Sequence, residues 1–134
     1  MKNGKCSLIK GIEEGKGTLF KVSFFSSARL IAFYIMHLLI EKSFYGKELM
    51  ERIEKDSEGT WVPNSGFIYP ILKKLSQEGL VKGKWSDRSK HKKCIYSITP
   101  EGEKIYKEVY PALKKDFEEF LGRLKKIEEE VFKE

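Results

Sequence analysis

Residues 65–85 read SGFIYPILKKLSQEGLVKGKW, and two different periodicities meet within them. In the first part apolar residues recur at i, i+3, i+4 and i+7, the spacing of one face of a helix. These residues are Ile68, Ile71, Leu72 and Leu75. The pattern predicts a helix that starts near Asn64 or Ser65 and ends at Gly79, since glycine is a common C-terminal stop. The segment then changes to a strand-like run at residues 80–85.

A second strand-like run follows at residues 94–98. The residues between the two runs are polar and mostly basic, which predicts a β-hairpin with a long basic tip. The basic residues of this tip are Arg88, Lys90, Lys92 and Lys93, against the single acid Asp87.

Two further helices are predicted upstream. Ser26 or Ser27 can cap a helix that runs to about Lys42, and a second helix follows from about Tyr45 to Asp56. Three short helices followed by a hairpin are typical of a winged helix-turn-helix. The predicted fold is therefore mainly α with a small β-hairpin, in which the third helix enters the major groove of DNA.

The face of the third helix opposite its apolar residues supports this prediction. At 100° per residue it comprises Gly66, Pro70, Lys73 and Gln77, with Tyr69 and Lys74 on the flanks. Two lysines and no acid before Glu78 favour a DNA-binding surface over an ordinary solvated face. The alternative is a winged helix that binds another protein and no DNA, which would favour an apolar or acidic face. An RNA-binding role ranks lower, because no platform of stacking aromatics is evident.

Charge is concentrated in the same part of the chain. Among its 134 residues, Lys and Arg exceed Asp and Glu by 26 to 20. Residues 65–98 hold 8 basic and 2 acidic side chains, whereas the flanking segments nearly balance. Such a segment predicts a polyanionic partner. Two distant cysteines and an apolar run too short to span a bilayer indicate a cytoplasmic protein without a membrane partner.

The C-terminal segment carries a separate signal. Thr99 is a good helix cap and Pro100 suits the first helical position. Beyond them apolar residues alternate spacings of four and three, as in a coiled-coil seam. The stripe comprises Tyr106, Tyr110, Leu113, Phe117, Phe120, Leu124, Ile127 and Val131. It predicts a helix that packs on its own domain or, preferably, forms a homodimer, with a bend or restart at Pro111.

Three units are predicted: residues 1–25 as an extension with a hint of a short strand at residues 20–24, 26–99 as the DNA-binding domain, and 100–134 as the dimerisation helix. Enzymatic function is not expected. His37 and His91 lie at no useful spacing from a carboxylate or thiol, and His37 is expected to be a partly buried packing residue. We predict no catalytic residues, metal site or cofactor.

Four short stretches resemble a known family. They are YGKEL at residues 45–49, GTWVPNSGFIYPILKKL at 59–75, EGLV at 78–81 and YSITPEG at 96–102. Together they resemble the PadR family of winged-helix repressors over about residues 28–110, and the Tyr-Pro inside the third helix is an unusual and specific choice. Residues 1–25 lie outside the resemblance.

The resemblance implies a dimer that binds operator DNA and is released by a small hydrophobic or aromatic effector. It places the DNA-facing positions at Asn64, Ser65, Tyr69 and Lys73, with the wing at residues 88–93. Of the two tryptophans, Trp85 is a weak candidate for effector binding, whereas Trp61 is expected to be core.

Overall fold

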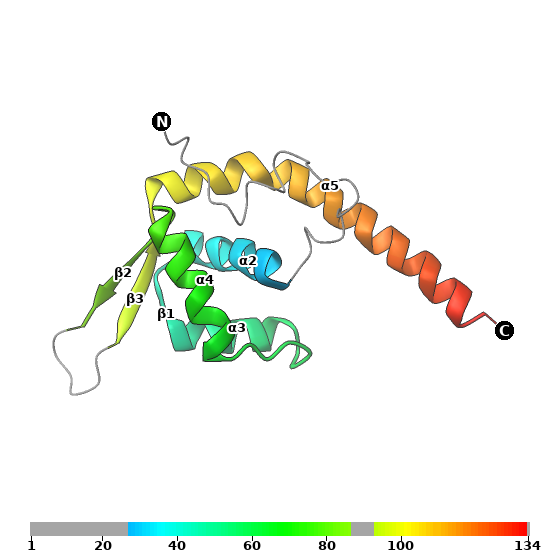
Figure 1. Cartoon of the computed structure of the whole chain (residues 1–134), viewed down its shortest axis with the longest axis horizontal. Helices are drawn as coiled ribbons and strands as arrows, with labels where there is room; N and C mark the ends of the chain where they lie inside the picture. The colour runs from blue at the N-terminus through cyan, green and yellow to red at the C-terminus, as the bar shows by residue number, and fades with distance from the viewer. Residues whose placement is uncertain (1–26, 87–92, 134) are drawn as a thin grey trace.

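The computed structural model describes residues 27–86 and 93–133, and Figure 1 shows how their elements are arranged. In chain order the elements are α2 (Ser27–Glu41), β1 (Phe44–Tyr45), α3 (Gly46–Asp56), α4 (Ser65–Gln77), β2 (Val81–Trp85), β3 (Cys94–Ile98) and α5 (Pro100–Val131). Three helices, a hairpin and a long last helix confirm the predicted winged-helix fold class. The strand suggested for residues 20–24 lies outside the described residues.

The sheet has one more strand than the sequence predicted. Its order is β1-β3-β2, and both pairings are antiparallel. β2 and β3 form the hairpin, called the wing below, with Val81 opposite Ile98 and Trp85 opposite Cys94. β1 adds a two-residue pairing in which Phe44 lies opposite Tyr96. Two residues are too few to show the alternation that identifies a strand.

The apolar run in α2 forms the centre of the core. This helix contacts α4, α5 and β3, so several of its sides are covered. Ile31, Ile35, Met36 and Leu38 are fully buried. Burial on several sides accounts for the run that the sequence shows. No helix in the described part of the chain is long and apolar enough to cross a membrane.

Both ends of α4 are fixed by local hydrogen bonds. At its start the Asn64 Oδ1 accepts the backbone N–H of Phe67 at 3.0 Å, a standard N-cap. At its end Gly79 adopts a φ of +78°, and the N–H of Leu80 donates to the carbonyl of Leu75 at 2.9 Å. Pro70 lies inside α4 without ending the helix.

Thr99 joins the wing to α5. Its N–H donates to the Leu80 carbonyl at 3.1 Å, and its hydroxyl donates to the Gly79 carbonyl at 2.7 Å. The same hydroxyl accepts the N–H of Gly102 at 3.0 Å as the N-cap of α5. This corner is tight, because a Cβ at Gly102 would lie 2.1 Å from the Leu80 carbonyl oxygen. The start of α5 is therefore held against the end of α4.

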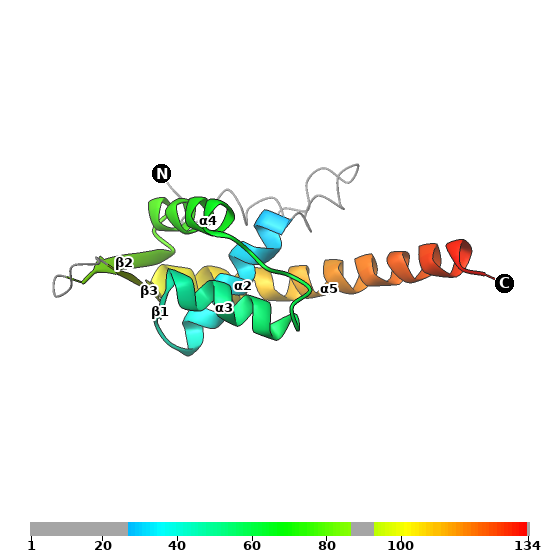
Figure 2. The ribbon, with the colours of Figure 1, turned by 90° about the horizontal axis from the view of Figure 1, so that it is seen from below.

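α5 has a first part that packs in the core and an outer part that extends away from it (Figure 1). Its first turns bury Ile105 and Val109 in the common core. The outer part extends beyond the other elements, at the end opposite the wing, in both views (Figures 1 and 2). The helix continues through Pro111 without a break, and its axis changes direction where yellow passes into orange in Figure 1. It therefore bends rather than restarts, as expected of an internal proline.

Candidate nucleic-acid interface

α4 separates its apolar and polar residues cleanly. Ile68, Ile71, Leu72 and Leu75 are buried. The residues predicted to face outward are exposed, and they are Gly66, Tyr69, Pro70, Lys73, Lys74 and Gln77. Helix period and burial thus agree, and the two lysines lie on a surface that a large partner can reach.

The start of α4 adds two polar groups to this surface. Asn64 and Ser65 are both exposed. The cap bond to Phe67 engages the side-chain oxygen of Asn64 and leaves its amide nitrogen outside that bond. The structure therefore brings Asn64, Ser65 and Tyr69 to the exposed side of one helix.

Tyr69 also makes a contact that sequence reasoning missed. Its ring lies directly against Gly46, the first residue of α3, where a Cβ would meet the Tyr69 Oη at 2.6 Å and Cε1 at 2.7 Å. The two residues border a cleft of about 410 Å³, here called the wing cleft. Its lining comprises Tyr45, Gly46, Lys47, Glu48, Tyr69, Trp85, Lys93 and Cys94.

The wing supplies the other wall of this cleft. Lys93 is exposed, and its Nζ lies 5.7 Å from the centre of the Tyr45 ring, within range of a cation–π interaction. Behind it, burial and a hydrogen bond with Cys94 raise the pKa of Tyr96. The predicted contacts Arg88, Lys90 and Lys92 lie outside the described residues. Lys93 is therefore the one predicted wing contact that falls within the described residues.

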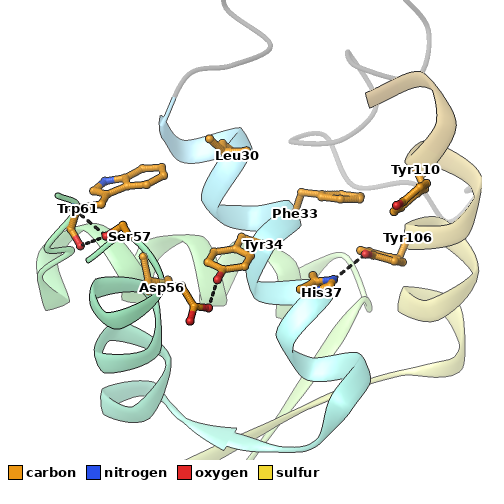
Figure 3. Close-up of a pocket in the computed structure, with 10 residues that line it drawn as sticks. Leu30, Phe33, Tyr34, His37, Asp56, Ser57, Trp61, Tyr106 and Tyr110 are labelled. Atoms are coloured by element: carbon orange, nitrogen blue, oxygen red, sulfur yellow. Dashed lines mark hydrogen bonds between the residues drawn. The ribbon is translucent and has the colours of Figure 1, made fainter. Parts of the chain in front are cut away.

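A second pocket, of about 410 Å³, lies between α2, the end of α3 and α5 (Figure 3). It is mostly apolar and is called the aromatic pocket below. Its lining comprises Leu30, Phe33, Tyr34, His37, Ile53, Asp56, Ser57, Trp61, Tyr106 and Tyr110. Phe33 stacks on Tyr106 with the ring centres 4.6 Å apart.

Two residues singled out in the sequence, Trp61 and His37, line the aromatic pocket. Trp61 packs against the core, as expected, but is only half-buried and also lines the pocket. His37 is more exposed than predicted, but it packs as predicted: its ring centre lies 5.9 Å from that of Tyr34, and its Nδ1 lies 2.8 Å from the Tyr106 hydroxyl. Trp85, the weaker effector candidate, lies instead in the wing cleft and is 60% exposed.

Polar groups close one edge of the aromatic pocket. The Tyr34 hydroxyl donates a hydrogen bond to the Asp56 carboxylate, which also pairs with Arg52 at 3.1 Å (Figure 3 shows the first bond). Burial, followed by this bond, raises the pKa of Tyr34 to about 12. The same bond, with help from Arg52, lowers the pKa of Asp56. Tyr34 thus stays protonated and Asp56 charged at neutral pH.

The predicted dimerisation stripe follows the outer part of α5. Leu113 is buried within the chain, at 5% exposure, and Phe120 is half-buried. Tyr106, the first member, is also buried in the subunit's own core. Five members remain exposed: Tyr110, Phe117, Leu124, Ile127 and Val131. Leu121 and Phe132 are also exposed and were not part of the predicted stripe.

The described residues contain no group of three or more His, Cys, Asp or Glu side chains arranged to hold a metal ion.

Comparison with known proteins gives one family. The sequence model of the transcriptional regulator PadR-like family matches residues 35–108, more than half of the chain. A search of curated proteins found no match.

Solved structures show the same fold. A transcriptional regulator from Clostridium thermocellum is 27% identical, with a TM-score of 0.53 over 78% of this chain and 90% of that one. A PadR family transcription regulator from Clostridium difficile is 26% identical, with a TM-score of 0.51 over 68% of this chain and 97% of that one. Bacillus subtilis PadR, solved in complex with operator DNA, is 24% identical, with a TM-score of 0.53 over 63% and 47% of the two chains.

Proposed function

This chain belongs to the PadR-like family of transcriptional regulators, and we propose that it binds operator DNA through α4 and the wing. The observation that carries the proposal is the division of α4, whose apolar side is buried while Tyr69, Lys73 and Lys74 are exposed. Lysines on a recognition helix supply phosphate contacts, and the tyrosine hydroxyl supplies a further donor. The Bacillus subtilis relative, which binds operator DNA, has the same fold.

The alternative is a winged helix that binds protein instead of DNA. It would favour an apolar or acidic face on α4, whereas the described face carries Lys73 and Lys74. Membership of a family of transcriptional regulators also supports DNA binding over this alternative.

Replacing Lys73 by alanine tests the proposal. If Lys73 contacts a phosphate, its loss reduces the number of counterions released on binding, and the slope of log affinity against log salt falls by roughly 0.9 per contact. A dimer carries the contact twice, so we expect a slope flatter by roughly 1.8. The measurement is binding to a selected operator at four salt concentrations. Lys126→Ala, on the outer part of α5, is the control and should leave the slope unchanged. An unchanged slope for Lys73→Ala would remove α4 from the interface.

We further propose that the protein acts as a homodimer, with residues 100–134 as its dimerisation helix and residues 26–99 as its DNA-binding domain. A stripe of exposed apolar side chains along a helix marks a surface for a partner. Four exposed members of the α5 stripe support a second copy as that partner: Tyr110, Leu124, Ile127 and Val131.

Finally, we propose that the protein is a repressor released by a small hydrophobic or aromatic effector, which enters the aromatic pocket. The stacked rings of Phe33 and Tyr106 and the half-buried Trp61 offer flat apolar surfaces to such a ligand. Because the pocket joins α2 and α3 to α5, an occupant contacts both the DNA-binding domain and the dimerisation helix.

Tryptophan fluorescence tests effector binding. The chain has two tryptophans, so Trp85→Phe leaves Trp61 as the reporter of the aromatic pocket. A planar apolar aromatic should quench this variant and weaken operator binding, and Trp61→Phe should show no quenching. Quenching seen only in Trp61→Phe, where Trp85 is the remaining tryptophan, would instead indicate that the ligand binds in the wing cleft. No response to a broad panel of aromatics would contradict the effector proposal.

A further inference from the structure

The wing cleft lies where the start of α3, α4 and the wing meet. The start of α3 provides Gly46 and Lys47, α4 provides Tyr69, and the wing provides Trp85 and Lys93. α3 was not assigned a DNA contact from the sequence. The cleft is about 410 Å³, which is larger than a phosphate group requires, so a backbone phosphate with part of its sugar can enter.

We propose that the wing cleft binds one backbone phosphate of the operator, with Lys47 as a direct contact and Gly46 as a positioning residue for Tyr69. This inference rests on the proposed DNA-binding function. It adds α3 to the interface and gives Gly46 a role in binding.

The charges around the cleft favour an anion. Lys47 and Lys93 are both exposed, and Lys93 lies over the Tyr45 ring, which limits where its ammonium group can move. Glu48 is the acidic member of the described lining. Its Oε1 accepts the backbone N–H of Tyr45 at 2.8 Å, which ties this carboxylate to the start of α3. Two cations against one engaged carboxylate leave a net positive charge.

The contact between Gly46 and Tyr69 explains how the tyrosine hydroxyl is placed. Tyr69 is 41% exposed, and an exposed tyrosine is normally free to change rotamer. Here its ring lies against the buried Gly46, at distances that no side chain on residue 46 would permit. The absence of a Cβ thus lets the Tyr69 ring lie against the start of α3, with its hydroxyl at Gly46 and in the same cleft as Lys47. A hydroxyl held in place loses less entropy when it donates to a phosphate.

The location of the cleft favours a phosphate of DNA over a free anion. Its walls include Tyr69 of α4 and the tip end of the wing strands at Trp85 and Cys94, and these are the two elements that approach the duplex in a winged helix. A phosphate held between them would fix the wing relative to α4. Such contacts set the register of the protein on the duplex and carry no base preference of their own.

The charge of Lys47 is tested against a matched lysine of the same helix. Lys55, in the last turn of α3, lies among Glu51, Glu54 and Glu58 and away from the cleft. Lys47→Ala should flatten the salt slope by roughly 1.8 per dimer, and Lys55→Ala should not. A Lys47→Ala slope equal to that of Lys55→Ala would overturn the inference. Because Lys73→Ala is measured in parallel, a flattened slope there with none for Lys47→Ala would refute the wing-cleft site alone.

The positioning role is tested by a double-mutant cycle. Gly46→Ala should weaken operator binding by displacing Tyr69, and the same change in a Tyr69→Ala background should cost little, because the clashing ring is gone. Thermal unfolding of all three variants checks that the fold is retained. An equal loss of affinity in both backgrounds would show that Gly46 does not act through Tyr69.

Competition by inorganic phosphate tests whether the wing cleft binds a phosphate of the DNA backbone or a free anion. Replacing chloride by phosphate at constant ionic strength should leave operator affinity within about twofold if the cleft needs the DNA backbone, since one free phosphate makes few contacts. Strong competition by phosphate that disappears in Lys47→Ala would instead assign the cleft to a free anion and overturn the proposal.

Discussion

Placing two glutamates on the exposed stripe of α5 will separate the proposed dimer into monomers. Leu124 and Ile127 are exposed in the subunit, so Leu124→Glu/Ile127→Glu leaves the core of each subunit intact. In a dimer these positions are covered, and burying an unpaired carboxylate costs several kcal/mol. A monomer holds only one half-site, so operator affinity should fall by roughly 10²–10⁴-fold. Sedimentation and operator binding measure the two effects.

The opposite face of α5 provides the control. Lys115→Gln/Lys126→Gln lowers the net charge by the same amount on exposed positions away from the stripe, and it should remain dimeric. Truncation after Pro111 removes every member of the stripe beyond Tyr110 and should yield monomers or insoluble protein. A dimer that survives the glutamates would place the interface elsewhere.

Gly102→Ala will destabilise the protein by about 3 kcal/mol, at the upper end of the range for overpacking. The new methyl group would lie 2.1 Å from the Leu80 carbonyl oxygen and 2.7 Å from the Ile98 Cγ1. The carbonyl cannot move aside easily, because it also accepts the N–H of Thr99. Moving α5 away from Leu80 would relieve the clash, but it would break this corner of the fold.

Gly122→Ala is the matched control in the same helix. A Cβ at Gly122 meets nothing within 4 Å, so alanine should stabilise the helix by about 0.5–1 kcal/mol. Urea unfolding at one fixed protein concentration measures both variants, since a dimer's stability depends on concentration. Shifts of the same sign for both variants would refute the assignment of Gly102 as a close-contact position.

The sequence predicted the elements whose signals are local. The period of Ile68, Ile71, Leu72 and Leu75 identified α4 and its buried side, and the cap at Thr99 identified the start of α5. These features depend on spacing and on backbone hydrogen bonds within a few residues, which a single sequence records.

Features that depend on distant partners were not predictable in this way. β1 exists because Phe44 and Tyr45 pair with a strand about fifty residues later. The contact of Gly46 with Tyr69 joins two helices, and neither residue carries a local sign of the other. Trp61 was expected in the core, and only the three-dimensional arrangement of α2, α3 and α5 shows that one side of it lines a pocket.

The corner at Thr99 has an evolutionary consequence. If the protein binds its operator as the homodimer proposed above, the surface of α4 contacts the bases of each half-site, whereas α5 holds the two subunits and sets the separation of the two half-sites. The hydrogen bonds of Thr99 connect these two parts through backbone carbonyls of Gly79 and Leu80, which mutation of surface side chains leaves in place. In such a dimer, half-site sequence and half-site spacing would diverge independently among descendants of this protein, each through substitutions in a different stretch of the gene.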